Sequence, residues 1–409
     1  MLFLLGCRLF SWRIAALACL LVAVTPMHIQ QAHFYTMDSI QVFLVMVALY
    51  FAVRVAQQGD PRDYALLGVF YGLATASKIS AATFGLVVVA ACAVRAWYNW
   101  DARRRVFGDA PAALVGAGRP VVLTEHGSTG SAAPRHPSRV VELLAAIETP
   151  LAGCLLALLL AAIVFRIGQP YALQGPNLWN VGLNPKYVAD MTGWQKISTG
   201  EIDQPPSVQW ANRTPYVYAL EQMVRWGMGV PLGLAAWSGV IAATVVLLRA
   251  LGTRAGRARW LPLVVPLVWI GFNWYYWGKA FANAMRYFLP IYPLLILLAS
   301  WALVGFIVWA RRGPALGERW SALQRWLPAM ASALLVVVVG YTALYGLAYM
   351  SIYLQKTTRV AASEWIMLNL PPGTRIANEH WDDPVPLRVQ GRDSLPWAGP
   401  QLELYAEED

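Results

Sequence analysis

Nine apolar stretches of roughly 14 to 24 residues constrain this chain more than any other feature of its sequence. An α-helix needs about 20 mostly apolar residues to cross the roughly 30 Å of hydrocarbon in a bilayer. Only 13% of the residues are charged and the mean hydropathy is +0.46, whereas soluble domains carry about 25% charged residues. The pattern predicts an all-α polytopic membrane bundle of about nine transmembrane helices. The stretches cover residues 12–27, 39–57, 64–77, 80–97, 146–167, 227–249, 260–277, 287–310 and 327–350.

The basic residues are concentrated on one side of this predicted bundle. If the nine stretches alternate in direction, one set of connecting segments holds 19 Lys and Arg against 8 Asp and Glu, and the rest of the chain holds 13 against 14. Because cytoplasmic loops are enriched in Lys and Arg, the first set is predicted to be cytoplasmic, including a linker at 98–145. The segments near 27–38, 168–226 and after 350 are then external. The net charge of +10 is accounted for by this topology, so no nucleic-acid partner is expected. The spans predict a multi-pass protein of the cell membrane.

The first external loop places His33 and Asp38 just before a long apolar stretch. A carboxylate close to a helix N-terminus is stabilised by the helix dipole, and it can also hold a cation or orient a sugar hydroxyl. We therefore predict catalytic roles for Asp38 and, in the same cavity, for His33. The alternative is an ordinary helix-capping aspartate beside interfacial histidines.

Lys78 lies between two short apolar stretches, in the sequence Ser77-Lys78-Ile79-Ser80. A charged lysine in the middle of one long helix would be costly, so a polar turn at the outer surface is expected here. An ammonium group beside hydroxyls suits a phosphate or pyrophosphate. The alternative is a lysine whose charged end extends to the membrane interface.

The long external loop 168–226 contains a polar and aromatic stretch that includes Asp203, Gln209 and Trp210. Loops of this length without secondary structure are uncommon unless they are functional or disordered. Aromatic faces with amide and carboxylate neighbours suit a sugar ring. These three residues are therefore predicted to bind substrate.

Arg286 and Tyr287 open a late apolar stretch, next to a run of aromatic residues at 273–281. A guanidinium buried at this position needs an anionic partner, which a lipid-linked phosphate would supply. The alternative is a belt of interfacial aromatics with exposed cations.

The tail from residue 351 predicts the start of an external α/β domain. A helix near 360–369 is followed by Pro371-Pro372-Gly373 and then by a short strand near 375–378. A divalent metal is possible at the acidic residues that follow, although such dense spacing constrains little. The bundle is predicted to occupy residues 1–350 and the tail domain residues 351–409. This acidic cluster, with one histidine in it, consists of Glu379, His380, Asp382 and Asp383.

These segments together resemble a known group of membrane enzymes. The carrying motifs are HxxxxD at 33–38, SKxS at 77–80, PPSxQWAxxTPY at 205–216, MRYFLPIYP at 285–293 and WIxxNLPPGTxIANEHWDD at 365–383. Their order resembles the polytopic GT-C glycosyltransferases, specifically the bacterial relatives of protein O-mannosyltransferases (family 39).

The resemblance implies that a mannose-like sugar moves from a polyprenyl-phosphate carrier to an acceptor at the external face, usually with inversion. The acceptor, whether protein, lipid or glycan, is not indicated. Asp38 corresponds to the second acidic position of the family pattern, because the span and loop of the principal carboxylate are expected before Met1. The chain is accordingly expected to be a fragment that lacks its N-terminal span and its C-terminal end, and one that may be inactive.

Two other functional classes compete with a transferase. A lipid-linked sugar transporter or flippase would place polar residues around a cavity at the membrane midplane. A non-catalytic membrane scaffold would tolerate replacement of Asp38, Lys78 and Arg286. The observed polar residues cluster at the predicted outer interface, which favours a transferase, here a hexosyltransferase.

Overall fold

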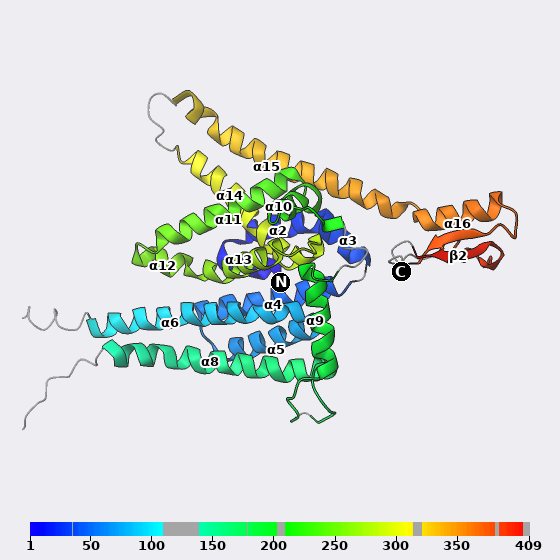
Figure 1. Ribbon diagram of the computed structural model, residues 1–409. Helices are drawn as coiled ribbons and strands as arrows, with labels where there is room; N and C mark the ends of the chain where they lie inside the picture. The colour runs from blue at the N-terminus through cyan, green and yellow to red at the C-terminus, as the bar shows by residue number, and fades with distance from the viewer. Residues whose placement is uncertain are drawn as a thin grey trace, which may run out of the picture.

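The computed structural model describes residues 1–34, 36–108, 139–177, 179–202, 209–313, 321–380 and 384–403. Long helices run side by side through most of the molecule (Figure 1), which confirms the predicted all-α bundle of a multi-pass membrane protein. Within these ranges, six helical segments are long and apolar enough to cross a membrane, or seven if α2 (Trp12–Ala23) and α3 (Pro26–Phe34) form one span bent by 58°. The six are α4 (Met37–Gln57), η1 (Ile79–Phe84) with α6 (Gly85–Gly108), α8 (Arg139–Gly168), α11 (Val230–Ala250), η6 (Met285–Ile291) with α14 (Tyr292–Arg311), and α15 (Ser321–Met350).

The predicted count of nine spans is not confirmed, because two of the expected helices are short. The first, α5 (Pro61–Ser77), has 17 residues, and the second, α13 (Val264–Gly278), has 15, against the roughly 20 that a full crossing needs. The start of α5 is fixed by Asp60, whose side chain accepts a hydrogen bond from the Arg62 amide at 2.8 Å. At its other end Lys78 is extended, so the predicted break before η1 is confirmed.

Small residues allow α5 and α8 to pack more extensively than any other pair of described helices. Gly68 and Gly72 are four residues apart on α5, and they face Ala157 and Ala161, also four apart, on α8. A Cβ added at Gly72 would lie 2.6 Å from the Ala161 carbonyl oxygen. Such small residues at one-turn spacing let helix backbones approach closely in a bilayer.

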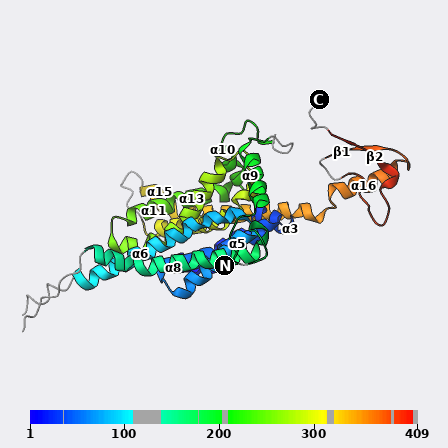
Figure 2. The same ribbon diagram turned by 60° about the horizontal axis from the view of Figure 1, so that its bottom comes forward.

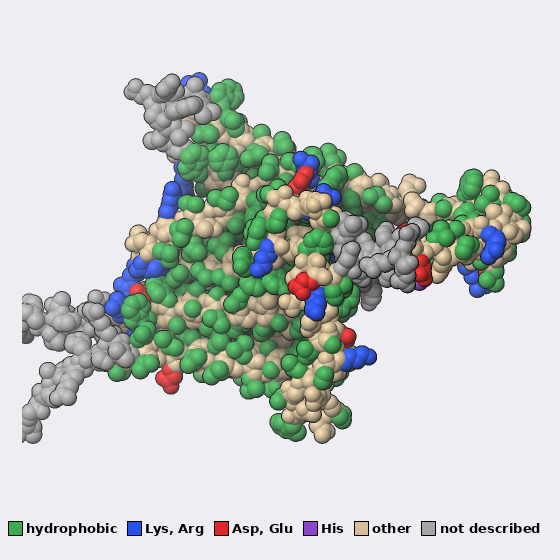
Figure 3. All heavy atoms as spheres, viewed as in Figure 1, with side chains coloured by type: hydrophobic (Ala, Val, Ile, Leu, Met, Phe, Trp, Pro, Cys, Tyr) green, Lys and Arg blue, Asp and Glu red, His purple; other side chains and the backbone are tan. Residues whose placement is uncertain are grey.

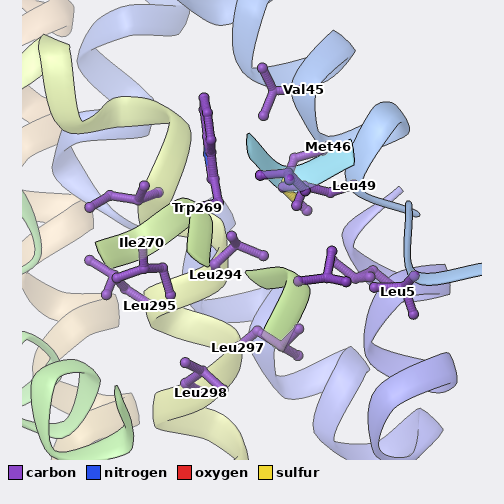
Figure 4. Close-up of a cluster of buried hydrophobic side chains, with 14 of the residues drawn as sticks. Leu5, Val45, Met46, Leu49, Trp269, Ile270, Leu294, Leu295, Leu297 and Leu298 are labelled. Carbon is purple, nitrogen blue, oxygen red and sulfur yellow. The ribbon is translucent and has the colours of Figure 1, made fainter. Parts of the chain in front are cut away.

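A hydrophobic core joins the N-terminal helices of the bundle to α13 and α14 (Figure 4). Its largest fully buried side chain is Trp269 of α13, whose indole nitrogen donates to the Pro290 carbonyl oxygen at 3.3 Å. Leucines of α14 surround it, and α1 (Leu2–Leu9) and α4 close the cluster. The 285–293 segment, which carries Arg286 and Tyr287, is thereby anchored on its inner side.

The segment 168–226, predicted to be a long external loop, contains a helix that was not predicted. Residues Pro185–Thr199 form α9, which lies across the ends of α4, α5 and α8 in Figure 1. Asn184 caps its start by accepting from the Lys186 amide, and Gly200 ends it at φ +82°, a conformation that glycine adopts readily. A second short helix, α10 (Val217–Gln222), leads through the π-helical turn η4 (Met223–Gly227) to α11. The remaining short elements are η2 (Pro170–Ala172), α12 (Arg254–Trp260), η5 (Leu261–Leu263), η8 (Ser351–Leu354) and η9 (Leu395–Trp397).

The C-terminal part forms a small α/β unit that projects from the end of α15 (Figures 1 and 2). It contains α16 (Thr358–Asn369) and two parallel strands, β1 (Ile376–Glu379) and β2 (Ala398–Leu402). Trp397 is buried and donates to the Leu370 carbonyl oxygen at 3.2 Å. The predicted helix and first strand are confirmed, while the boundary at residue 351 stays a prediction.

Candidate functional site

Asp38 lies in the first turn of α4 and is buried, with its side chain 9% exposed. The helix-capping position belongs to Thr36, not Asp38. The Asp38 carboxylate accepts a hydrogen bond from the Lys78 ammonium at 2.5 Å, across 40 residues of sequence. Two of the predicted site residues therefore form one ion pair, which no local sequence pattern connects.

The break between α5 and η1 positions Lys78 for this pairing. Its backbone is extended, at φ −158° and ψ 119°, so the side chain leaves the end of α5 toward the start of α4. The neighbouring Ser80 hydroxyl accepts from the Gln41 amide at 2.9 Å, which joins the same two elements a second time. An ammonium group has three donors, so Lys78 retains donors for a further anion beside Asp38.

Arg286 and Tyr287 bring a second cation to the same place. The Lys78 ammonium lies 5.4 Å from the centre of the Tyr287 ring, and the Arg286 guanidinium lies 5.8 Å from it. Arg286 is exposed and has no ion-pair partner in the described part of the chain. The expectation of a buried guanidinium is therefore wrong, since η6 begins at the surface and keeps this side chain in contact with solvent.

A cavity of about 470 Å³ lies next to the Tyr287 ring. Its wall includes Trp277, whose ring centre lies 4.6 Å from that of Tyr287. Two backbone hydrogen bonds hold the segments around it together: the Tyr216 amide donates to Gly278 at 2.7 Å, and the Ala282 amide donates to Ser198 at 3.1 Å. The lining residues are Gln195, Ser198, Thr199, Trp210, Arg213, Thr214, Pro215, Tyr218, Tyr276, Trp277, Lys279, Ala280, Phe281 and Asn283.

The other predicted site residues are placed differently. Trp210 lines the 470 Å³ cavity, whereas Gln209 is exposed and Asp203 lies outside the described residues. His33 is not joined to Asp38: its ring stacks on Tyr353 with centres 3.8 Å apart, and its Nδ1 lies 2.7 Å from the Ile29 carbonyl oxygen. His33 and Ser39 both line a cavity of about 420 Å³. The two ring contacts of His33 nevertheless do not involve the Asp38 carboxylate.

The donor set around Asp38 does not fit a divalent cation. Such ions prefer several oxygen ligands, while Asp38 faces an ammonium group and contacts no second carboxylate in the described part of the chain. In the described ranges, no three His, Cys, Asp or Glu side chains come together as a metal site. In the tail, Asp382 and Asp383 lie outside those ranges.

Sequence analysis missed most of the cavity wall. Tyr218, Tyr276 and Phe281 contribute aromatic faces, and Arg213 and Lys279 contribute cations. The signal was present in the aromatic run at 273–281, but a membrane-interface belt has the same composition. Only the fold shows that this run turns toward the end of α9.

Comparisons with known proteins match the chain to a solved structure and to a family model. Among solved structures, the chain is similar to an oligosaccharyltransferase from Archaeoglobus fulgidus tethered with an acceptor peptide, at 14% identity and a TM-score of 0.47. That match covers 91% of this chain and 45% of the other, so this chain spans less than half the length of the archaeal protein. No curated protein matches. Residues 1–118 match the model of the family described as dolichyl-phosphate-mannose-protein mannosyltransferase, so the resemblance to GT-C membrane glycosyltransferases is confirmed over the segment that carries Asp38 and Lys78.

Proposed function

We propose that this chain acts as a membrane glycosyltransferase that moves a mannose-like sugar from a polyprenyl-phosphate carrier to an acceptor at the external face. The observation that carries the proposal is the convergence of Asp38, Lys78 and Arg286 around Tyr287, beside an aromatic cavity. The three residues come from segments far apart in the sequence. They supply the charges that a lipid-linked phosphate needs.

The charges of this cluster match the donor. Two cations and one carboxylate leave a net charge of +1, which suits the single negative charge of a sugar-linked phosphodiester. In the transfer, the bond between the sugar C1 and the phosphate oxygen breaks, a bond from the acceptor hydroxyl oxygen to C1 forms, and the hydroxyl proton passes to a general base or to water. The phosphate then gains a second negative charge, which Lys78 and Arg286 stabilise because they are already in place. Asp38 holds Lys78 in position and orients the sugar hydroxyls.

The cavity beside the cluster suits a sugar or a glycan acceptor. Binding sites of this kind are concave and mostly apolar, with a few polar groups that fix orientation. Trp210, Tyr218, Tyr276 and Trp277 provide aromatic faces, and Asn283 provides an amide. A flippase is less well supported, because the cavity at the middle of the spans, between α11, α14 and α15, has an almost wholly apolar wall.

Membranes that contain the chain should transfer labelled mannose from polyprenyl-phosphate-mannose to endogenous acceptors. The label should appear in an acid-stable glycosylated product. It should not appear when a nucleotide sugar is the donor and the membranes contain no carrier lipid. The control is the same membrane with the Lys78→Met variant, in which the carrier phosphate loses a cation. Transfer that is equal in the two membranes would contradict the proposed role of the cluster.

Replacing Trp210 by alanine should raise the acceptor KM about 30-fold with a smaller effect on the donor KM, since truncating an aromatic anchor at a binding site costs about 2 kcal/mol. Steady-state transfer with varied acceptor measures this. The control is Trp179→Ala, which removes a ring that is 93% exposed in the same external segment. An equal loss in both variants would show that the 470 Å³ cavity does not bind the acceptor.

The orientation of the bundle is tested by labelling single cysteines. In a background without the four native cysteines, Glu201→Cys should react with an impermeant maleimide on intact cells, and Arg312→Cys should react only after permeabilisation. Both positions are exposed and lie at opposite ends of the bundle. The positive-inside rule places the arginine end in the cytoplasm. The reverse labelling pattern would place the candidate site on the cytoplasmic face.

A further inference from the structure

A separate cavity of about 420 Å³ opens at the end of the bundle opposite Asp38. It lies between the α4–α5 turn, the second half of α6 and the first half of α8. Its polar lining consists of Tyr64, Arg95, Asn99, Arg103 and Thr149, and none of the described lining residues is acidic. No step of the proposed transfer uses this cavity.

Arg95 is held in a fixed position at the cavity wall. Its Nη1 donates to the Gln57 carbonyl oxygen at 3.0 Å, where α4 ends. The following Gly59 has φ +70°, and a Cβ there would lie 2.7 Å from Arg95 Nε. The turn thus packs directly on the guanidinium of Arg95 and fixes its position. Its other N–H groups can then bind an anion at little cost in side-chain entropy.

Tyr64 provides a second, independent indication of a ligand. The residue is 1% exposed and lines the cavity, yet its hydroxyl has no hydrogen-bond partner in the described part of the chain. A buried polar group left unpaired costs about 1–3 kcal/mol. An oxygen-rich ligand in the cavity would satisfy this hydroxyl and the two guanidinium groups together.

The surroundings correspond to the headgroup level of a bilayer. Arg104 lies over the Trp100 ring at 4.2 Å, and Arg257 lies over the Trp97 ring at 5.6 Å; tryptophan is typical of the membrane–water interface. Lys and Arg side chains gather at the end where α12 lies (Figure 3). The nearby carboxylate of Asp101 is already paired with Arg254 at 2.9 Å, so it does not compete for an anion.

We propose that this cavity binds the phosphate-bearing headgroup of an anionic phospholipid from the leaflet at the arginine-rich end. Basic pockets between transmembrane helices at this level bind anionic headgroups in other membrane proteins. Arg95 and Arg103 would pair with the phosphate, while Asn99, Thr149 and Tyr64 would bond its oxygens. The acyl chains would extend along the exposed apolar surface of α8, where Leu151 and Leu155 face outward.

The test uses the purified full chain in nanodiscs of phosphatidylcholine with a minor fraction of phosphatidylglycerol. Native mass spectrometry of the released protein counts the phosphatidylglycerol that stays bound. The double variant Arg95→Gln/Arg103→Gln should lower this retention at least tenfold. The control is Arg311→Gln/Arg312→Gln, which removes two exposed arginines at the same end of the bundle but outside the cavity, and it should change retention less than threefold. Equal retention in the two double variants would overturn the proposal.

Tyr64→Phe separates a binding role from a structural one. It removes only the unpaired hydroxyl, so without phosphatidylglycerol the variant should unfold at the same or a higher temperature than the parent. With phosphatidylglycerol it should lose part of the stabilisation and about threefold in retention. A lower unfolding temperature without lipid, with unchanged retention, would overturn the assignment of this hydroxyl to a ligand.

A soluble phosphate distinguishes the two sources of the anion. Glycerol 3-phosphate at millimolar concentration should stabilise the detergent-solubilised chain far less than phosphatidylglycerol, because it lacks the acyl chains. If it protects equally well, the cavity is a site for a free phosphate ester, and the assignment to a phospholipid is wrong.

Discussion

Asp38→Asn is expected to lower sugar transfer at least a hundredfold while the chain remains folded. The asparagine preserves the shape of the side chain but removes the charge that holds the Lys78 ammonium at 2.5 Å. Without its partner, Lys78 is free to leave the Tyr287 ring, and the cation that meets the developing phosphate charge is misplaced. Loss of one such preorganised group typically costs about 10²–10³ in rate. Initial rates per folded molecule, with polyprenyl-phosphate-mannose as donor, measure the effect.

A matched control distinguishes this role from a purely structural ion pair. Asp63 is 1% exposed and pairs with Arg54 at 2.8 Å, at the other end of the same group of helices. Breaking a buried pair from one side costs about 3–5 kcal/mol, so Asp63→Asn should reduce the unfolding free energy. Its rate per folded molecule should nevertheless stay within threefold of the parent. If Asp38→Asn merely destabilises and leaves that rate unchanged, Asp38 is not part of the site.

Lys78→Met complements this variant, because it removes the cation and leaves the carboxylate buried alone. If the pair acts as a unit, the double variant Asp38→Asn/Lys78→Met should be no slower than the slower single variant. Residues that act together are non-additive in this way. Multiplied losses would indicate that Asp38 and Lys78 contact the substrate independently.

The spans were predictable from the sequence because a bilayer imposes a length and a composition on any helix that crosses it. The turn at Lys78 was predictable for the same reason, since a charge in the middle of a span is costly. The exact number of spans was harder to predict. Helix α5 is bounded by Asp60 and Lys78 before it reaches full length, and α13 starts only after the 3-10 turn η5. Hydropathy alone does not show whether such a segment crosses the membrane.

The candidate site was predictable as a set of residues but not as an arrangement. Asp38 and Lys78 are 40 residues apart, and Arg286 and Tyr287 are farther along the chain, so only packing brings the ion pair to Tyr287. His33 was expected to share the cavity with Asp38 because it precedes it by five residues. In the fold, α3 turns that ring toward Tyr353 instead.

The missed helix α9 shows a limit of hydropathy analysis. Its sequence has mixed polarity, so neither a membrane span nor a strong amphipathic pattern marks it. Its boundaries carried the information: Asn184 followed by proline is a typical helix start, and Gly200 is a typical helix end. These two signals predict a surface helix of about the observed length, which then covers the candidate cavity.

The close packing of α5 on α8 leads to a large expected change in stability. Gly68 faces the backbone of Ala157, and a side chain there meets the Ala157 carbonyl group and not a movable side-chain end. Gly68→Leu should therefore separate the two helices and lower the unfolding free energy by about 3 kcal/mol, at the upper end of the usual cost of overpacking. Titration of the purified chain with SDS, followed by circular dichroism, measures this change.

The control is Gly340→Leu on α15, because a Cβ at Gly340 meets nothing within 4 Å. Both substitutions replace glycine within a long helix, and both gain about 1 kcal/mol of intrinsic helix propensity. The control should thus be neutral or stabilising, so that the difference between the variants isolates the contact of α5 with α8. Since α5 also positions Lys78, Gly68→Leu should weaken transfer as well as stability, whereas Gly340→Leu should preserve both. An equal response of the two variants would mean that α5 and α8 are not held together by close backbone approach.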